Sequence, residues 1–402
     1  MMDNWNLRHL RAVAAIVRLG SICSAAEAVS ISQPAITQGL FKLEAQLGVA
    51  LFSRLPEGMQ PTEAAMLLAP RIERALHHIG SPRVTMAQVR ALLALAEGGS
   101  YARASALTGL SQPTLHRALA DLAVALCHTL VERRGKGIGF TAYGWRMIRA
   151  FRLARAELLS GLAEIETLKG REVGKITIGA MPLSRARVLP MAVAAFHALY
   201  PGVRIVITEG AFLELIEPLR DGDLDLIVGA LRDPPPGNDV EQEPLFFDRP
   251  AIIGRRGHPL ADCDPTMADL ASFPWIVSPQ GTPLYGQWRA MFEQAGLALP
   301  TVPIECGSVV AIRQLLITSD FLTVLSPDQV AIELSTQWLH RIANAPAGLT
   351  RTIGMMTRSG WQPTLVQAAF VEQLRLASRQ GVLPGRDGAP AAADVLQMAE
   401  AP

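Results

Sequence analysis

Residues 32–44 read SQPAITQGLFKLE and residues 111–122 read SQPTLHRALADL, so a short phrase recurs after 79 positions. The similarity continues on both sides at the same offset and without a gap. Gly20-Ser21 corresponds to Gly99-Ser100, and Thr62 corresponds to Thr141. A constant offset over this length indicates a duplicated structural unit.

Each copy predicts a helix, a tight turn, a second helix and a short hairpin. In the first copy, apolar residues recur at helical spacing between Leu7 and Val17. Ser32 stands where an N-cap belongs, and Pro34 falls in the first helical turn, where a missing N–H costs nothing. The buried stripe of the second helix comprises Ile36, Leu40, Leu43 and Leu47. Its outward residues are mostly polar, which favours a helix-turn-helix, whose second helix enters the DNA major groove.

The candidate DNA contacts lie on the second helix and on the hairpin, or wing, of each copy. In the first copy they are Ser32, Gln33, Pro34, Ala35, Thr37, Gln38, Lys42 and Arg54. In the second copy they are Ser111, Gln112, Thr114, His116, Arg117, Arg133, Arg134 and Lys136. Two alternatives remain open: one copy reads DNA while the other is a packing or oligomerisation module, or both are plain helical bundles with polar faces.

The net charge of +1 hides a difference between the two halves of the chain. Residues 1–169 carry a net charge of +7, and residues 170–402 carry −6. Residues 81–169 alone account for +6. Because basic side chains that neutralise phosphates supply most sequence-independent affinity for DNA, the second copy is predicted to bind the phosphate backbone more strongly.

Length and composition limit the remaining possibilities. With 402 residues, half of them hydrophobic, the chain can form two or three packed domains. The N-terminus lacks a signal-peptide pattern and no apolar run is long enough to span a bilayer, so we expect a cytoplasmic protein without membrane contact. GxSxG, HExxH and phosphate-loop motifs are absent and the four cysteines lie far apart, so neither an enzyme nor a cofactor or metal site is predicted.

The second half alternates short apolar strands with helices. KITIGA (175–180), RIVITEG (204–210) and LDLIVGAL (224–231) are the first three strands of this series. The alternation predicts parallel sheets covered by helices. We expect two α/β lobes, lobe I from 174–250 with 341–380 and lobe II from 251–340, and a loose tail at 381–402.

Residues 141–169 predict a long amphipathic helix between the two halves. Its apolar positions include Trp145, Phe151 and Leu162, and they form a face that a small domain cannot bury alone. Either a second chain covers this face, or the helix lies on its own domain.

Residues 21–54, SICSAAEAVSISQPAITQGLFKLEAQLGVALFSR, resemble the winged helix-turn-helix of LysR-type transcriptional regulators. The second copy keeps this frame more loosely, with Ala123 in place of a Glu and Cys127 in place of a Gly. The resemblance implies double-stranded DNA as a partner, RNA polymerase as a further partner, and a homodimer or homotetramer in which helix 141–169 pairs between subunits. An ordinary member has one such unit, whereas this chain has two, at 1–80 and 81–140.

Residues 170–380 resemble the effector-binding domain of the same family, a relative of type 2 periplasmic binding proteins. The phrases AMPLSRA (180–186) and GALRDP (229–234) are most similar to the subgroup typified by the galactose-binding-protein regulator. The resemblance implies a small-molecule effector, a sugar or small organic acid, between the two lobes. A cytoplasmic solute-binding protein is the alternative for this part of the chain.

Three expected helix starts would offer free N–H groups to such an effector at the carboxyl ends of the strands. The candidates are Leu183, Ser184, Arg185, Gly281, Thr282, Ser308 and Val309. For each Ser or Thr, a plain N-cap without a ligand is the alternative. The expected fold is therefore α + α/β, with two winged helix-turn-helix units, a linker helix and a two-lobed effector domain.

Overall fold

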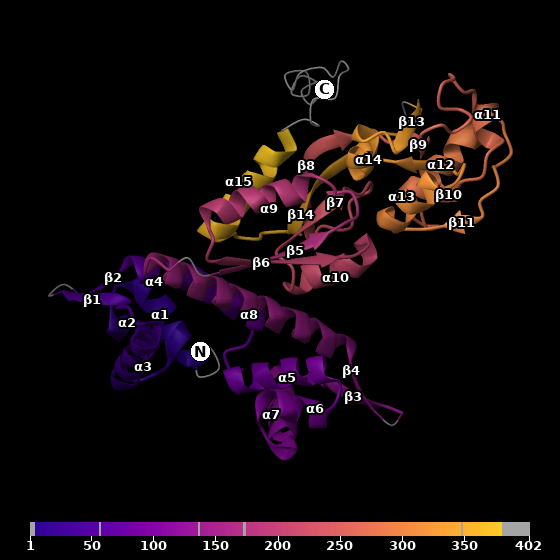
Figure 1. The fold of residues 1–402 in the computed structure, drawn as a ribbon. Helices are drawn as coiled ribbons and strands as arrows, with labels where there is room; N and C mark the ends of the chain where they lie inside the picture. Colours follow the sequence, from indigo (N-terminus) through magenta and orange to yellow (C-terminus); the bar gives the residue numbers. More distant parts are fainter. Residues whose placement is uncertain (1–4, 56–57, 136, 172–173, 347–348, 380–402) are drawn as a thin grey trace, which may run out of the picture.

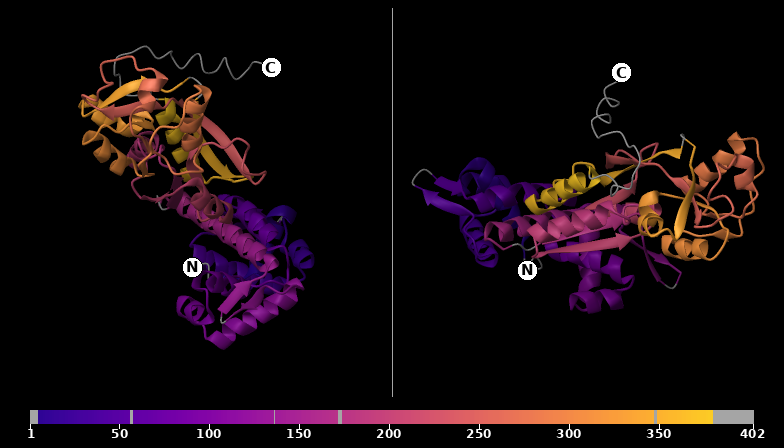
Figure 2. Two further views of the ribbon diagram at one scale, coloured as in Figure 1. Left: turned by 90° about the vertical axis from the view of Figure 1, so that its right-hand side faces the viewer. Right: turned by 45° about the horizontal axis from the view of Figure 1, so that its top comes forward.

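The computed structural model describes residues 5–55, 58–135, 137–171, 174–346 and 349–379. The chain forms two parts (Figures 1 and 2). A helical module at the N-terminal end carries both copies of the repeat, and a two-lobed α/β domain follows it. The long helix α8 (Ala142–Leu168) lies between them. The predicted tail at 381–402 and the candidate Lys136 lie outside the described residues.

The two copies have the same order of elements. Unit one consists of α1 (Leu7–Leu19), α2 (Ile22–Val29), α3 (Gln33–Leu47), β1 (Phe52–Leu55), β2 (Gly58–Pro61) and α4 (Glu63–Ile79). Unit two consists of α5 (Met86–Gly98), α6 (Tyr101–Thr108), α7 (Gln112–Leu126), β3 (Val131–Arg134), β4 (Gly137–Phe140) and α8. Each element of unit two begins 79 residues after its counterpart, so the duplication includes the long helix at the end of each unit.

Local sequence accounts for these boundaries. Ser32 and Ser111 both stand at N-cap positions, but only the Ser111 hydroxyl accepts a capping hydrogen bond, from the Thr114 N–H at 3.3 Å, among the described residues. Gly48 ends α3 with a φ of 67°, a conformation that glycine adopts readily. Its counterpart Cys127 ends α7 with a φ of 57°, so unit two keeps the turn without the glycine.

The helices α4 and α8 pack against each other in antiparallel directions. Leu68, early in α4, lies beside Gly161, late in α8, whereas Ile79 at the end of α4 lines one cavity with Leu158 and Ala154. One cluster of buried hydrophobic residues runs through both units and both long helices, from Trp5 to Ile165. The predicted long helix is confirmed, and its buried face packs against α4 of the same chain.

Lobe I is built on a five-stranded sheet with the strand order β6-β5-β7-β14-β8. As predicted, β5 (Gly174–Ala180), β6 (Val203–Glu209) and β7 (Leu226–Ala230) run parallel. The sheet becomes mixed because β14 (Arg351–Arg358) runs antiparallel to β7 and to β8 (Val240–Asp248). Helices α9 (Val188–Leu199) and α15 (Leu365–Arg379) cover one face, and α10 (Phe212–Asp221) covers the other.

Lobe II contains two small groups of strands. The strand β9 (Ala251–Arg255) lies between β12 (Thr323–Leu325) and β13 (Leu339–Asn344), and it pairs with both in antiparallel directions. The pair β10 (Ile276–Val277) and β11 (Ile304–Glu305) is parallel. The helical segments are α11 (Met267–Ala271), α12 (Pro283–Gln294), α13 (Val309–Ile317), η2 (Pro327–Val330) and α14 (Ala331–Ser335).

The predicted boundary between the lobes at residues 340 and 341 is wrong. It divides β13, which pairs with β9 over residues 339–344 and therefore belongs to lobe II. The chain returns to lobe I only before β14. No helix among the described residues is long and apolar enough to cross a membrane.

Candidate DNA interface and effector lobes

The outward face of α3 places most of the candidates from the first copy side by side. Ser32, Gln33, Pro34, Gln38 and Lys42 are exposed, and Ala35 and Thr37 are half-buried. A shallow surface depression is lined by Gln33, Pro34, Thr37, Gln38 and Phe41. Sequence reasoning missed Phe41, which is 73% exposed although it is aromatic. Its spacing of four residues from Thr37 could have revealed it, because such residues share one face of a helix.

The matching face of α7 is also exposed and has a different chemistry. Ser111, Gln112, Thr114, His116 and Arg117 are all exposed. The His116 ring stacks on Tyr101 of α6 with 3.5 Å between ring centroids, and this contact holds the imidazole in one orientation. The Thr114 hydroxyl lies 2.8 Å from the Ser111 hydroxyl, so these two candidates contact each other.

The wings are two-stranded antiparallel hairpins, β1–β2 and β3–β4. Arg54 lies in β1, and Arg133 and Arg134 lie in β3. The Arg133 side chain is exposed. Two of the arginines predicted to contact phosphates therefore lie on the wing of unit two.

The position of α3 depends on a close contact with α1. A Cβ atom added at Gly39 would lie 2.5 Å from the His9 ring, so only glycine lets the two helices approach this closely. Burial, together with the positive charge of Lys42, holds the pKa of His9 below its ordinary value. Burial beside Lys42 therefore favours the neutral imidazole.

Acidification is therefore expected to destabilise unit one through His9. Because the unfolded chain binds the proton more readily, stability from this group is fully present above about pH 6.5 and decreases as the pH falls from there toward the lowered pKa of the folded state. We expect the melting temperature of His9→Gln to decrease less than that of the wild type between about pH 8 and pH 5.5. Burial also lowers the pKa values of His78 and His258. Both residues are present in the wild type and in His9→Gln, so they do not contribute to the difference between the two. Identical pH profiles would contradict the expectation.

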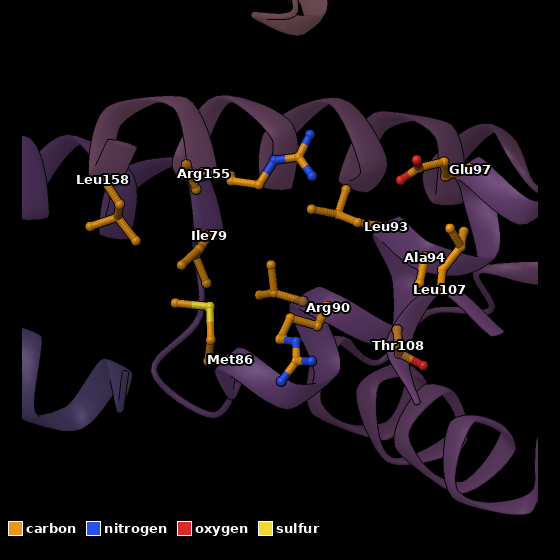
Figure 3. A pocket seen from close by; sticks show the side chains of 12 residues that line it. Ile79, Met86, Arg90, Leu93, Ala94, Glu97, Leu107, Thr108, Arg155 and Leu158 are labelled. Atoms are coloured by element: carbon orange, nitrogen blue, oxygen red, sulfur yellow. The ribbon is translucent and has the colours of Figure 1, made fainter. Parts of the chain in front are cut away.

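A cavity of about 320 Å³ separates α5 of unit two from α8 (Figure 3). Its walls include Leu93 and Arg90 of α5, Arg155 of α8 and Ile79 of α4. In unit one the residue that corresponds to Arg155 is Leu76, which packs against the hydrophobic core. The two units share their elements but do not dock identically on the helix pair.

The side of α8 that faces lobe I carries a row of arginines. The Arg149 Nε atom donates to an Asp221 carboxylate oxygen at 2.8 Å, and Arg152 forms an ion pair with the same carboxylate. Asp223 lies 4.0 Å from both Arg152 and Arg155. These three arginines contribute to the +6 charge of residues 81–169, but they face the acidic end of α10 and the turn after it, so the net charge overstated the basic surface available to DNA.

The buried side chain of Arg71 joins α4, α8 and lobe I. Its Nε atom donates to Glu164 at 3.1 Å, and its Nη1 atom donates to Glu157 at 3.3 Å and to the Gln362 carbonyl at 2.7 Å. Burial alone would lower the pKa of this guanidinium, but the hydrogen bonds and charges of the two glutamates outweigh burial and raise the pKa. Arg71 therefore stays charged and ties the helix pair to the loop before α15.

One of the three expected helix starts in the effector lobes is absent. Ser184 is fully buried in a turn, and its hydroxyl donates to the Met181 carbonyl at 2.8 Å, while α9 begins only at Val188. The prediction that Ser184 caps a helix is wrong, because the turn satisfies its hydroxyl. Leu183 is also buried, and Arg185 forms an ion pair with Glu209.

The other two helix starts are present, both in lobe II. Thr282 caps α12 by accepting the Tyr285 N–H at 3.3 Å, after Gly281 with a φ of 81°. Ser308 caps α13 by accepting the Ala311 N–H at 3.4 Å, and Val309 is the first residue of that helix. Each hydroxyl is occupied by its own helix, which is the plain N-cap alternative.

Sequence reasoning missed a cation at the carboxyl edge of lobe I. Arg232 follows β7, and its guanidinium lies 4.3 Å from the centroid of the Phe212 ring. Its Nε atom is buried and has no hydrogen-bond partner among the described residues. The phrase GALRDP contained this arginine, but only the tertiary structure shows that its side chain is half-buried beside an aromatic ring.

Lobes I and II are joined by an ion pair. The Arg187 Nε atom donates to an Asp328 carboxylate oxygen at 2.8 Å, and both side chains are largely buried. Arg187 precedes α9 in lobe I and Asp328 lies in η2 of lobe II. This contact connects the two lobes beside the turn that contains Ser184.

Comparison with known proteins agrees with this architecture. Residues 7–66 and 86–145 each match the bacterial regulatory helix-turn-helix of the LysR family, and residues 169–378 match the LysR substrate binding domain. The HTH-type transcriptional regulator GalR of Pseudomonas putida is 33% identical over 92% of this chain and 96% of its own length. Because less than a tenth of this chain is left out, that alignment includes parts of both units.

Two further comparisons cover smaller parts of the chain. The HTH-type transcriptional regulator GbpR of Azospirillum brasilense is 27% identical over 61% of this chain and 72% of its own length. The crystal structure of full-length CbnR complexed with its target DNA has a TM-score of 0.51 and 21% identity, over 72% of this chain and 98% of CbnR. The relatives are named as regulators and not as enzymes. The chain belongs to the LysR family of DNA-binding transcriptional regulators and carries the helix-turn-helix unit of that family twice.

Proposed function

We propose that both helix-turn-helix units contact DNA, and that a small anionic effector held between the lobes changes how they do so. One observation carries the first statement: α3 and α7 both lie on the side of the helix pair away from the effector lobes (Figure 1), and both have exposed residues that are largely polar. The arginines of the unit-two wing supply further phosphate contacts. The alternative, in which one unit only packs or assembles, leaves one of these two faces without a role.

The proposed effector is a small organic acid, and a sugar is the second candidate. The support is Arg232, whose guanidinium has a buried and unpaired Nε atom at the carboxyl edge of the parallel strands, where ligands of such sheets bind. A carboxylate there would satisfy this group. The arginine row of α8 would transmit movement of the lobes to the DNA-binding module. The changed complex with DNA would then alter contact with RNA polymerase.

The first experiment is a footprinting titration of the DNA upstream of the protein's own gene, at several salt concentrations. The proteins compared are the wild type, Thr37→Ala with Gln38→Ala, and His116→Ala with Arg117→Ala. We expect each double variant to lose about ten-fold or more in affinity, because each good base contact is worth about 1–3 kcal/mol, and to lose a different part of the footprint.

Arg289→Ala is the control for loss of a surface arginine. Arg289 lies exposed in α12 of lobe II and pairs only with Glu293 of the same helix among the described residues, so its removal should leave DNA binding unchanged. If only one double variant were impaired, the other unit would be a packing module. If the wild type bound this DNA no better than random sequence, the proposal would be refuted for both units.

The effector proposal has its own measurement. A thermal-shift screen of the whole chain with small organic acids and sugars should raise the melting temperature with an acid, by the equivalent of about 2.7 kcal/mol at 100 times the dissociation constant. Arg232→Gln should abolish the shift while the melting temperature without ligand changes little. If the acid still raised the melting temperature of Arg232→Gln, the anion would bind at a site that does not include Arg232.

A further inference from the structure

The helix pair α4–α8 is made of two copies of the same element. Thr62 and Thr141 cap the two helices, and each hydroxyl donates to the corresponding carbonyl, of Ala50 and Thr129 respectively, at 2.8 Å. Most buried positions of α4 correspond to buried positions of α8 at the 79-residue offset. The matching buried pairs are Leu68 with Met147, Ile72 with Phe151, Ala75 with Ala154, and Ile79 with Leu158.

Equivalent faces that pack in antiparallel directions are related by a local two-fold axis. This is the arrangement of an isologous interface, in which the same surface is used on both sides. Here both sides belong to one chain, and the equivalent residues Ile79 and Leu158 line the same cavity, as residues near a two-fold axis do. Gly161, which lies against Leu68 and Arg71, comes from the part of α8 that extends beyond the counterpart of α4. A helix-turn-helix unit extends from each end of the pair. We call α3 and α7 the reading helices, because they are the helices expected to contact the bases. One chain therefore holds two reading helices in an arrangement like that of a two-fold symmetric dimer.

The two reading helices differ at the positions that face outward. At matching positions α3 has Gln38, Phe41 and Lys42, whereas α7 has Arg117, Ala120 and Asp121. All six side chains are exposed. On α3 the amide suits adenine, the aromatic ring suits the thymine methyl group and the lysine suits guanine, whereas on α7 the arginine suits guanine and the aspartate suits the cytosine amino group. The two units therefore have the chemistry to read different bases.

We propose that each chain by itself carries both DNA-reading helices of a complete module, and that its operator consists of two inverted but unlike half-sites. The inference rests on the proposed function, since it requires both units to contact DNA. Its physical reason is that the symmetry of an operator mirrors the symmetry of the protein. In this protein the helices keep approximate two-fold symmetry, whereas the side chains of the two reading helices differ.

The first test uses short duplexes taken from the footprint of the full chain. One duplex carries both native half-sites, and two symmetrised duplexes carry either half-site twice in inverted orientation. We expect the native duplex to bind about ten-fold or more tightly than each symmetrised one, because every symmetrised site mismatches one reader. Equal or tighter binding to a symmetrised duplex would overturn the inference, because two copies of the same unit would then be reading it.

In the second test, the two double variants described above, each with one impaired reading helix, are mixed and titrated against the native duplex. One carries Thr37→Ala with Gln38→Ala, and the other carries His116→Ala with Arg117→Ala. If both reading helices must come from the same chain, the mixture binds the native duplex no more tightly than the tighter-binding variant does alone. Recovery of affinity on mixing would show that readers from different chains combine and would overturn the inference. Absence of specific binding by the wild type is a separate result, because it refutes the proposed function instead.

Discussion

Arg71→Ala is expected to lower the free energy of unfolding of the DNA-binding module by about 3–5 kcal/mol, the cost of breaking a buried ion pair by removing one partner. Only 5% of the Arg71 side chain is exposed, and the carboxylates of Glu157 and Glu164 are 15% and 10% exposed. Without the guanidinium, the Glu164 carboxylate would lose its ion-pair partner, and the Glu157 carboxylate would keep only Arg74 among the described residues. The Gln362 carbonyl would also lose its donor.

Hydrogen exchange of peptides from α4 and α8 during a urea titration measures this loss where it occurs. Arg74→Ala is the matched control, because Arg74 is 32% exposed and pairs with Glu157 alone among the described residues, so a loss of about 1 kcal/mol or less is expected. A triple variant, Arg71→Met with Glu157→Gln and Glu164→Gln, should recover much of the lost stability, since no buried charge is then left unpaired. A small loss in Arg71→Ala would mean that water enters the helix pair and solvates the glutamates.

The second large effect is expected from Gly161→Leu at the crossing of α4 and α8. A Cβ atom at this position would already lie 2.9 Å from Leu68 Cδ1 and 3.2 Å from Arg71 Cβ. The rest of a leucine side chain must therefore separate the helices, which costs about 1–3 kcal/mol or more in a packed interior. Because the helix pair sets the spacing of the reading helices, binding to the native duplex should weaken together with stability.

Gly286→Ala provides the contrast for this substitution. Gly286 lies exposed within α12, and a Cβ atom there would meet nothing within 4 Å. This variant should be more stable by about 0.5–1 kcal/mol, since alanine loses less conformational freedom in a helix. Thermal melts and titrations of the native duplex compare the two variants. Unchanged melting and DNA binding in Gly161→Leu would show that α4 and α8 are not tightly packed in solution.

The sequence by itself determined the local elements of this protein. The 79-residue repeat predicted both helix-turn-helix units, because matched apolar positions specify matched helices wherever they occur in a chain. The apolar strands from Lys175 predicted the parallel β5–β6–β7 core of lobe I, because strands buried on both faces need uninterrupted apolar residues. These signals depend on neighbours in the chain and can be read without knowing the fold.

The tertiary structure decided what each face meets. The periodicity of α8 showed that one face had to be buried, but it did not show that α4 would cover it, and it did not pair Arg149 and Arg152 with Asp221. Likewise, the sequence of β13 does not indicate which lobe's sheet it joins. The sequence around Ser184 also does not distinguish a serine that caps a helix from one that closes a turn. Packing between distant segments depends on three-dimensional complementarity. The local pattern of residues in one segment does not specify which distant segment will pack against it.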